Sequence, residues 1–272
     1  MNAQTSTAPR SAVSVAELRR AWHAVQEGQF RPRRAPVPRA AHLTSWAPTG
    51  PTLAVVGATG SCGASTTALA VATAAGGPSR LIECATLTAS GLSAAATAEL
   101  GAHPSGWLQG RREDVLIERC NQVLVGPGEV PLPTDSDLLT VVDIGWELGQ
   151  VLTGTSWLSE HLLAAHTVIV LTVATVPGLR RLEAAAALLP QARIVAGVLG
   201  PRRRRWPREV SGALGHLSTA IDARGDLLEV PHDAGLAVRG MDSTPLPAPL
   251  ISCAARLLNH AELTPPMKGS NR

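Results

Sequence analysis

The sequence predicts an α/β protein built on a doubly wound, mostly parallel sheet in a three-layer sandwich. From residue 52 onward, short apolar runs rich in β-branched residues alternate with alanine-rich helical stretches, which is the pattern of β–α–β units. Two runs, residues 138–142 and 167–171, are almost continuously apolar, as expected of strands covered on both faces. A glycine-rich turn, residues 57–63, joins the first run to the first helical stretch.

The individual elements follow from this alternation. The apolar runs predict strands near residues 52–57, 80–84, 138–143, 167–173, 193–199 and 227–230. The stretches between and after them predict helices near residues 64–76, 91–100, 156–165, 178–189, 207–217 and 249–261. Residues 101–136 are acidic and less regular, with strand-like runs at 115–117 and 123–125.

We expect the α/β domain to span residues 51–262. Ahead of it, the sequence predicts disorder over residues 1–13, an amphipathic helix over 14–29 and a linker rich in proline and arginine over 30–50. Residues 263–272 are expected to form a flexible tail.

The expected helix at 14–29 opens with a capping box, Ser14 to Glu17. One apolar stripe follows at helical spacing and consists of Val15, Leu18, Trp22 and Val25. An isolated helix this short is marginal in water. The stripe therefore predicts docking, either on the chain's own domain or on a protein partner.

Composition limits the chemistry that the chain can perform. It has no tyrosine, and its single lysine is Lys268, so no lysine of the domain can clamp a phosphate or act as a base. Its four cysteines show no metal or redox spacing. With no apolar stretch long enough to cross a bilayer and no apolar leader at the N-terminus, the sequence predicts a cytoplasmic protein.

Positive charge is concentrated in the N-terminal arm. Residues 1–50 hold seven arginines against two glutamates, whereas the rest of the chain holds 17 basic and 19 acidic residues. Arg31, Arg33 and Arg34 of the linker could contact nucleic acid through charge alone. A second run, Arg202, Arg203, Arg204 and Arg205 with Trp206 beside it, allows the same interpretation. A solvated linker and a solvated face are the alternatives.

The glycine-rich turn predicts an anion site. Glycines allow positive φ and a close approach of ligand to backbone, and the first turn of the following helix offers free N–H groups. The candidate phosphate-binding residues are Gly57, Gly60, Ser61, Cys62, Gly63, Ala64, Ser65 and Thr66.

Two templates match this turn incompletely. In the P-loop pattern, Gly63 is the second glycine and Ser65 supplies the hydroxyl, but Ala58 and Ala64 stand where the first glycine and the lysine belong. The alternative is the G-A-T-G-x-x-G turn of a Rossmann-type NAD(P)-binding protein, which residues 57–63 spell out.

Two acidic residues close predicted strands. Asp143, followed by Ile144 and Gly145, is expected beside the turn, where an aspartate holds Mg²⁺ in P-loop proteins and is the candidate catalytic residue. Glu83 closes the second strand. It could hold a ribose in a Rossmann protein, lie near the phosphates, or simply face solvent.

Over residues 52 to about 245 the sequence resembles the ParA/MinD-like ATPases, a deviant P-loop group. Gly60, Gly63 and Thr66 match the group's loop, Ser65 keeps a hydroxyl, and Asp143 with Gly145 is similar to its acidic strand end. Residues 175–181 are similar to a turn that follows a strand in this group, and residues 230–233 to its P-x-D segment. The resemblance implies that the chain binds ATP, with Mg²⁺ held through Ser65 and Asp143. It also implies that the nucleobase lies near Pro231 and Asp233.

The resemblance has one major departure, because Thr59 and Ala64 replace both lysines of the group. The sequence thus predicts a degenerate member with weak or absent ATPase activity that acts as a regulatory protein in partition or positioning. A protein partner at residues 14–29 and a homodimer go with this interpretation. Two alternatives stay open: a Rossmann-type NAD(P) sensor, and an interaction or nucleic-acid-binding module without small ligand that acts through the basic arm.

Overall fold

The computed structural model describes residue 20 and residues 45–263. The chain divides into two units, residues 1–42 and 43–272, and the sheet with its helices belongs to the second. The expected segments at 1–13 and 14–29 (apart from residue 20), the linker up to residue 44 with Arg31, Arg33 and Arg34, and residues 264–272 of the tail lie outside the described residues.

One sheet of nine strands forms the centre of the described domain. The strands are β1 (Thr52–Gly57), β2 (Ser79–Cys84), β3 (Ala98–Ala102), β4 (Trp107–Arg112), β5 (Val115–Cys120), β6 (Leu139–Ile144), β7 (Thr167–Val173), β8 (Arg193–Gly200) and β9 (Leu227–Pro231). Their order is β3-β4-β5-β2-β6-β1-β7-β8-β9. All pairs from β5 to β9 are parallel, whereas the β3–β4 and β4–β5 pairs are antiparallel.

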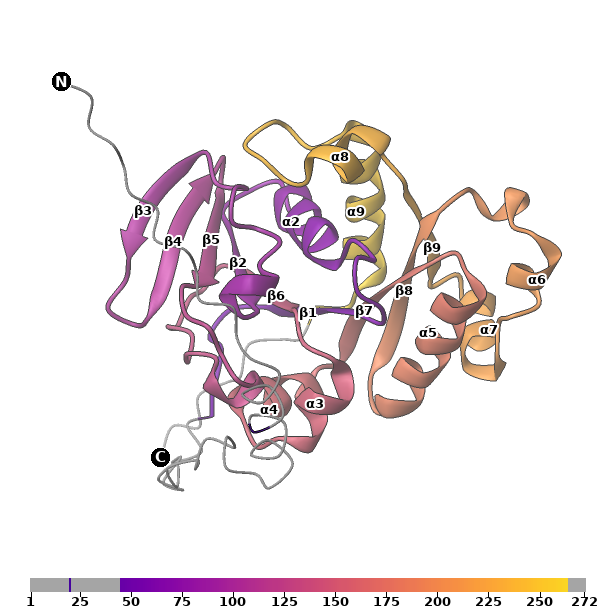
Figure 1. Cartoon of the computed structure of the whole chain (residues 1–272), viewed down its shortest axis with the longest axis horizontal. Helices are drawn as coiled ribbons and strands as arrows, with labels where there is room; N and C mark the ends of the chain where they lie inside the picture. Colours follow the sequence, from indigo (N-terminus) through magenta and orange to yellow (C-terminus); the bar gives the residue numbers. More distant parts are fainter. Residues whose placement is uncertain (1–19, 21–44, 264–272) are drawn as a thin grey trace. The chain divides into compact units, whose positions relative to one another are not determined.

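Helices cover both faces of this sheet (Figure 1). In the described chain they are α2 (Ala64–Ala74), α3 (Leu148–Thr153), α4 (Trp157–Ala164), α5 (Val176–Leu188), α6 (Arg208–Ser211), α7 (His216–Ala223), α8 (Ala234–Arg239) and α9 (Ala248–His260). Short 3₁₀ turns lie at η1 (Leu87–Ala89), η2 (Pro127–Glu129) and η3 (Arg203–Arg205). Among these residues no helix has the length and apolarity needed to cross a membrane.

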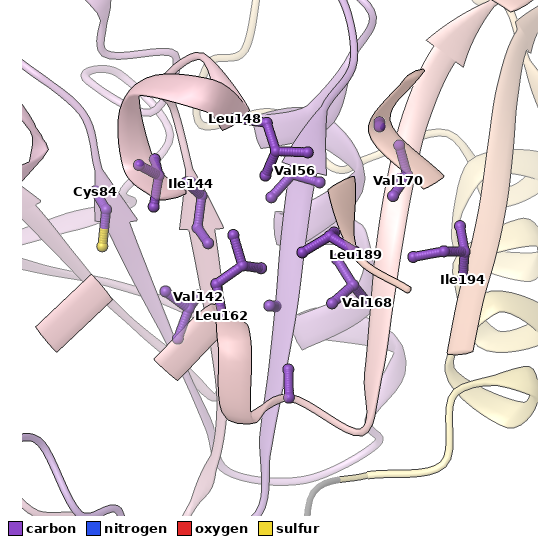
Figure 2. Packing of buried hydrophobic residues seen from close by; sticks show 14 of the residues in the cluster. Val56, Cys84, Val142, Ile144, Leu148, Leu162, Val168, Val170, Leu189 and Ile194 are labelled. Atoms are coloured by element: carbon purple, nitrogen blue, oxygen red, sulfur yellow. The ribbon is translucent and has the colours of Figure 1, made fainter. Parts of the chain in front are cut away.

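The alternation of side chains along β1 divides the core into two layers. Leu53 and Val55 of β1 belong to the cluster that contains the side chains of α2 and α9. Ala54 and Val56 belong to the other cluster, with side chains of α3, α4 and α5. Figure 2 shows part of this second layer, in which strand residues such as Val56 lie near the helical residues Leu148 and Leu162. This is the predicted three-layer α/β sandwich.

The predicted strands are confirmed, and the predicted helices at 64–76, 156–165, 178–189 and 249–261 match α2, α4, α5 and α9. The helix expected at 91–100 is wrong. Residues 90–97 form an irregular segment whose backbone groups bond to distant side chains, including Arg112, which donates to the Ala95 carbonyl at 3.0 Å. Residues 98–102 pair with β4 as strand β3 instead.

Two other expectations differ from the structure. The helix expected at 207–217 ends at Ser211, and α7 begins only after Gly215. The strand-like run at 123–125 is not a strand, since Val123 and Val125 are exposed and only Leu124 is buried. The strands β3 and β4 and the helices α3 and α8 were not predicted.

Candidate functional site

The glycine-rich turn connects β1 directly to α2. The Ala58 amide donates to the Leu171 carbonyl of β7 at 2.8 Å. This bond fixes the start of the loop at the carboxyl ends of the central strands. Ser61 and Gly63 both have positive φ, 55° and 79°. Glycine adopts this conformation without strain, whereas Ser61 is one of the few residues with a side chain that do so.

The first turn of α2 is free to receive an anion. Gly63 is the N-cap, and no side chain caps the helix in the described structure. No acidic residue lies in the first turn either. The N–H groups of this helix end therefore point out of the loop without a competing carboxylate, which is the arrangement that binds phosphate in other proteins.

A cavity of about 860 Å³ lies above this loop. The loop and helix start line it (Gly57, Ala58, Thr59, Gly60, Ser61, Cys62, Gly63, Ala64, Ser65 and Thr66). Its other walls come from Ala89 and Gly91, from residues 143–148 at the end of β6, from α5, and from Gly240 and Met241. Every loop residue predicted to bind phosphate therefore faces one cavity, and its volume is in the usual range for small-ligand sites.

Asp143 lies at the floor of this cavity. It is paired in register with Val55 of β1 and with Glu83 of β2. It is 0% exposed, and neither carboxylate oxygen has a hydrogen-bond partner among the described residues. The pKa of Asp143 is raised to about 7, mainly by burial and further by the charge of Glu83, with the nearby Ser65 hydroxyl acting in the opposite direction. A buried carboxylate without partners is rare in folded proteins and common at functional sites.

Two further polar groups at the cavity lack partners among the described residues. The Thr59 hydroxyl and the Trp146 indole N–H are both buried and form no hydrogen bond there. Both residues line the same cavity as Asp143. The cavity thus offers two neutral donors and one carboxylate that a bound ligand could satisfy.

Glu83, the other acid at a strand end, is hydrogen-bonded within the protein. Its carboxylate accepts hydrogen bonds from the Ser90 hydroxyl at 2.6 Å and from the amides of Gly91 and Leu92 at 2.6 and 3.1 Å. Burial raises the pKa of Glu83, and these donors partly offset the effect. Glu83 does not line the cavity. It holds the segment around Gly91 against the α2 end, where an added Cβ on Gly91 would lie 3.0 Å from the Ser65 Cβ.

Pro231 and Asp233, which are predicted to lie near the nucleobase, do not line the main cavity. Pro231 borders a separate depression of about 300 Å³, together with Gly200 and Arg202. The Asp233 carboxylate caps α8 by accepting the Leu236 amide at 2.7 Å. The loop after α8 reaches the main cavity instead, through Gly240 and Met241.

The run from Arg202 to Arg205 does not form a basic face with a stacking aromatic residue. Arg203 forms an ion pair with Asp222, and its guanidinium lies 5.8 Å from the centre of the Trp206 ring. Trp206 is buried and donates to the Pro201 carbonyl at 2.9 Å. The stacking of a nucleobase on Trp206 that the sequence suggested is therefore wrong, whereas Arg202, Arg204 and Arg205 are exposed.

The donor set fits a magnesium ion bound together with phosphate. No cluster of three or more histidine, cysteine or acidic side chains that could hold a metal exists within residues 45–263. Asp143 and Ser65 lie together beside the loop. Mg²⁺ typically takes one or two protein carboxylates, with phosphate oxygens and water completing its octahedron. The unpartnered Asp143 oxygens meet that need.

The order of the strands separates the two loop templates. In the dinucleotide-binding Rossmann sheet, the strand after the glycine-rich loop's helix lies beside the loop strand. Here β6, which carries Asp143, lies between β1 and β2. Glu83 is therefore two strands from the loop, too far along the sheet for the ribose contact of the Rossmann fingerprint. The chain has a P-loop NTPase-like fold.

Several residues of the cavity carry no signal for it in the sequence. Thr59 stands out only as the replacement for a lysine, and Trp146 follows the Asp143 motif directly. Arg181 belongs to the turn that the family resemblance includes. The direction of its side chain, however, depends on how α5 packs on the sheet. Nothing local to Gly91 indicates that Glu83 and Arg119 hold its segment from distant strands.

The chain is similar to some solved structures at low sequence identity. No family model matches the sequence, and a search of curated proteins finds no match. Among solved structures, a plasmid partition protein of Borrelia burgdorferi bound to AMPPNP is similar with a TM-score of 0.49 and 11% identity, over 78% of this chain and 97% of that one.

Two further solved structures are similar to the chain. The cell division ATPase MinD of Pyrococcus furiosus gives a TM-score of 0.46 at 14% identity, over 77% of this chain and 97% of that one. Apo McdA of Cyanothece gives 0.45 at 11% identity, over 77% and 98%.

Replacing Asp143 by asparagine should stabilise the ligand-free protein, more at pH 8 than at pH 5. The folded protein keeps the Asp143 proton up to about pH 7, whereas the unfolded chain releases it near the ordinary pKa of 3.8. Wild-type stability therefore falls as pH rises between these values. The full loss is on the order of 4 kcal/mol at pH 8.

Urea denaturation of both proteins in EDTA measures this difference. Asp114→Asn is the matched control, because Asp114 is 68% exposed and its replacement should change stability little at either pH. A gain for Asp143→Asn that is the same at pH 5 and pH 8 would contradict the assigned burial of the charge.

Proposed function

We propose that this protein is a nucleotide-binding P-loop protein of the ParA/MinD-like type that binds ATP or ADP with Mg²⁺. The observation that carries the proposal is Asp143, a fully buried carboxylate without partners among the described residues, at the floor of the cavity beside the phosphate-type loop. A purely structural aspartate would have hydrogen-bonding partners. A metal ion bound with phosphate would satisfy it.

Each part of the cavity has a role in this proposal. The amides of residues 60–66 and the start of α2 would hold the phosphates, because they present N–H groups and the positive end of the helix dipole. Ser65 and Asp143 would hold Mg²⁺, which neutralises phosphate charge when bound. The Thr59 hydroxyl and the Trp146 N–H would donate to phosphate oxygens or to water near them.

The missing lysines set the expected activity. Ala64 stands at the position of the P-loop lysine, and Thr59 at the position of the second lysine of the ParA/MinD group. Losing one preorganised donor to developing charge typically costs on the order of 10²–10³ in rate. We therefore infer a protein that binds nucleotide and hydrolyses it slowly or not at all, acting as a regulatory member of a positioning or partition system. Its partner contact at residues 14–29 and its homodimer stay predictions.

Mg²⁺ with ATP should raise the melting temperature of the purified protein, because a ligand that binds only the folded state stabilises it by mass action. At a ligand concentration of about 100 times Kd the gain is about 2.7 kcal/mol. NADH should have no effect. Ser65→Ala should reduce the stabilisation by Mg²⁺ with ATP, and Ser211→Ala should leave it unchanged, since Ser211 is an exposed helical serine outside the cavity.

Differential scanning fluorimetry over a concentration series of each nucleotide provides the measurement. Stabilisation by NADH and none by ATP would reject the proposal in favour of a dinucleotide sensor. Equal effects of ATP on wild type and Ser65→Ala would place the nucleotide elsewhere.

Ala64→Lys should increase ATP affinity about 10–100-fold, because it restores a charge-assisted hydrogen bond to phosphate. Ala223→Lys is the control, since Ala223 is an exposed helical alanine outside the cavity. Isothermal titration gives both affinities, and phosphate release gives turnover. Wild-type turnover as fast as that of Ala64→Lys would contradict the inferred inactivity.

A further inference from the structure

A phosphate site without lysine needs another source of positive charge. The cavity contains the carboxylates of Asp143 and Glu147 together with the anion-binding loop. Nucleoside triphosphates carry several negative charges, and loop amides supply only partial positive charges. Among the described residues that line the cavity, Arg181 is the one cation.

Helix α5 directs Arg181 to this cavity. Arg181, Ala184, Ala185 and Leu188 all line it, and their spacing of i, i+3, i+4 and i+7 defines one face of the helix. The small side chains of Ala184 and Ala185 leave room along this face. Arg180, the preceding residue, is rotated about 100° around the helix axis and does not line the cavity.

The loop and the start of α5 both lie at the carboxyl ends of the central strands. Thr175 caps α5 immediately after β7, and the Ala58 amide of the loop bonds to Leu171 of β7. Figure 1 shows α5 and α3 on the same side of the sheet. The α5 face therefore forms a wall of the cavity next to the loop, at the position from which a long side chain can reach a bound phosphate.

No other group in the described structure uses the Arg181 charge. Arg181 is exposed and forms no ion pair or hydrogen bond with residues 45–263. The nearest carboxylate along α5, Glu183, instead accepts the Leu217 and Ser218 amides at 2.8 Å each. Glu147, on the cavity wall, accepts the Gln150 amide at 2.9 Å.

We propose that Arg181 is the phosphate-binding cation of this site and replaces the missing loop lysine from the wall that α5 forms. This inference rests on the proposed nucleotide-binding function and adds the residue that selects polyphosphates. A guanidinium gives paired, charge-assisted hydrogen bonds to phosphate oxygens. Arg181 should therefore matter more for ATP than for ADP, and not at all for adenosine.

Four proteins test this inference: wild type, Arg181→Ala, Arg181→Lys and the matched control Arg180→Ala. Arg180 and Arg181 are adjacent and both exposed, so neither alanine variant should impair folding. We expect Arg181→Ala to weaken Mg²⁺-dependent ATP binding about 10–100-fold, with a smaller loss for ADP. Arg180→Ala should stay within about twofold of wild type, and Arg181→Lys should recover part of the loss.

Isothermal titration with ATP, ADP, adenosine and inorganic tripolyphosphate separates the outcomes. Equal ATP affinities of Arg181→Ala and Arg180→Ala would overturn the role of Arg181 and leave the proposed function intact. Arg181-dependent binding of tripolyphosphate without binding of any nucleotide would reject the proposed function and support the phosphate role of Arg181. Binding of neither nucleotide nor tripolyphosphate by wild type would reject both.

Discussion

The position of β1 between β6 and β7 determines the rest of the site. Its hydrogen-bond ladders to both neighbours are parallel and in register, so Val56 lies beside Ile144 and Gly57 beside Leu171. Parallel strands end at the same edge, where binding loops of such sheets are found. The glycine-rich loop, the Asp143 motif and the start of α5 therefore meet at one point, although the loop and α5 are more than a hundred residues apart in the chain.

Stability and function conflict at this point. An unpartnered carboxylate inside a protein is costly, and the folded chain meets that cost at Asp143 by raising its pKa toward neutrality. For the neighbouring Glu83, three donors from residues 90–92 partly offset the same cost. Two acids on adjacent strands thus differ: Glu83 holds the segment around Gly91, and Asp143 has no hydrogen-bond partner among the described residues.

The sequence predicts those parts of the fold whose signal is local. Apolar β-branched runs locate the central strands, and the glycines of residues 57–63 locate the loop. The hairpin of β3 and β4 escapes prediction because every side chain of β3 is exposed, so no alternation marks it as a strand. The segment at 90–97 resembles a helix in composition, but Glu83, Arg112 and Arg119 hold it in another conformation from distant positions. The proposed role of Arg181 depends on which face of α5 lines the cavity. The residues next to Arg181 in the sequence do not reveal this.

Amide hydrogen exchange tests most directly whether the loop is a phosphate site. The free loop offers amides with no side-chain cap, and their exchange should slow when phosphate oxygens accept hydrogen bonds from them. With saturating ATP and Mg²⁺, we predict protection of residues 57–66 and of 143–147, and no change in β3 or β4. Protection confined to other parts of the chain, or none at saturation, would contradict the account.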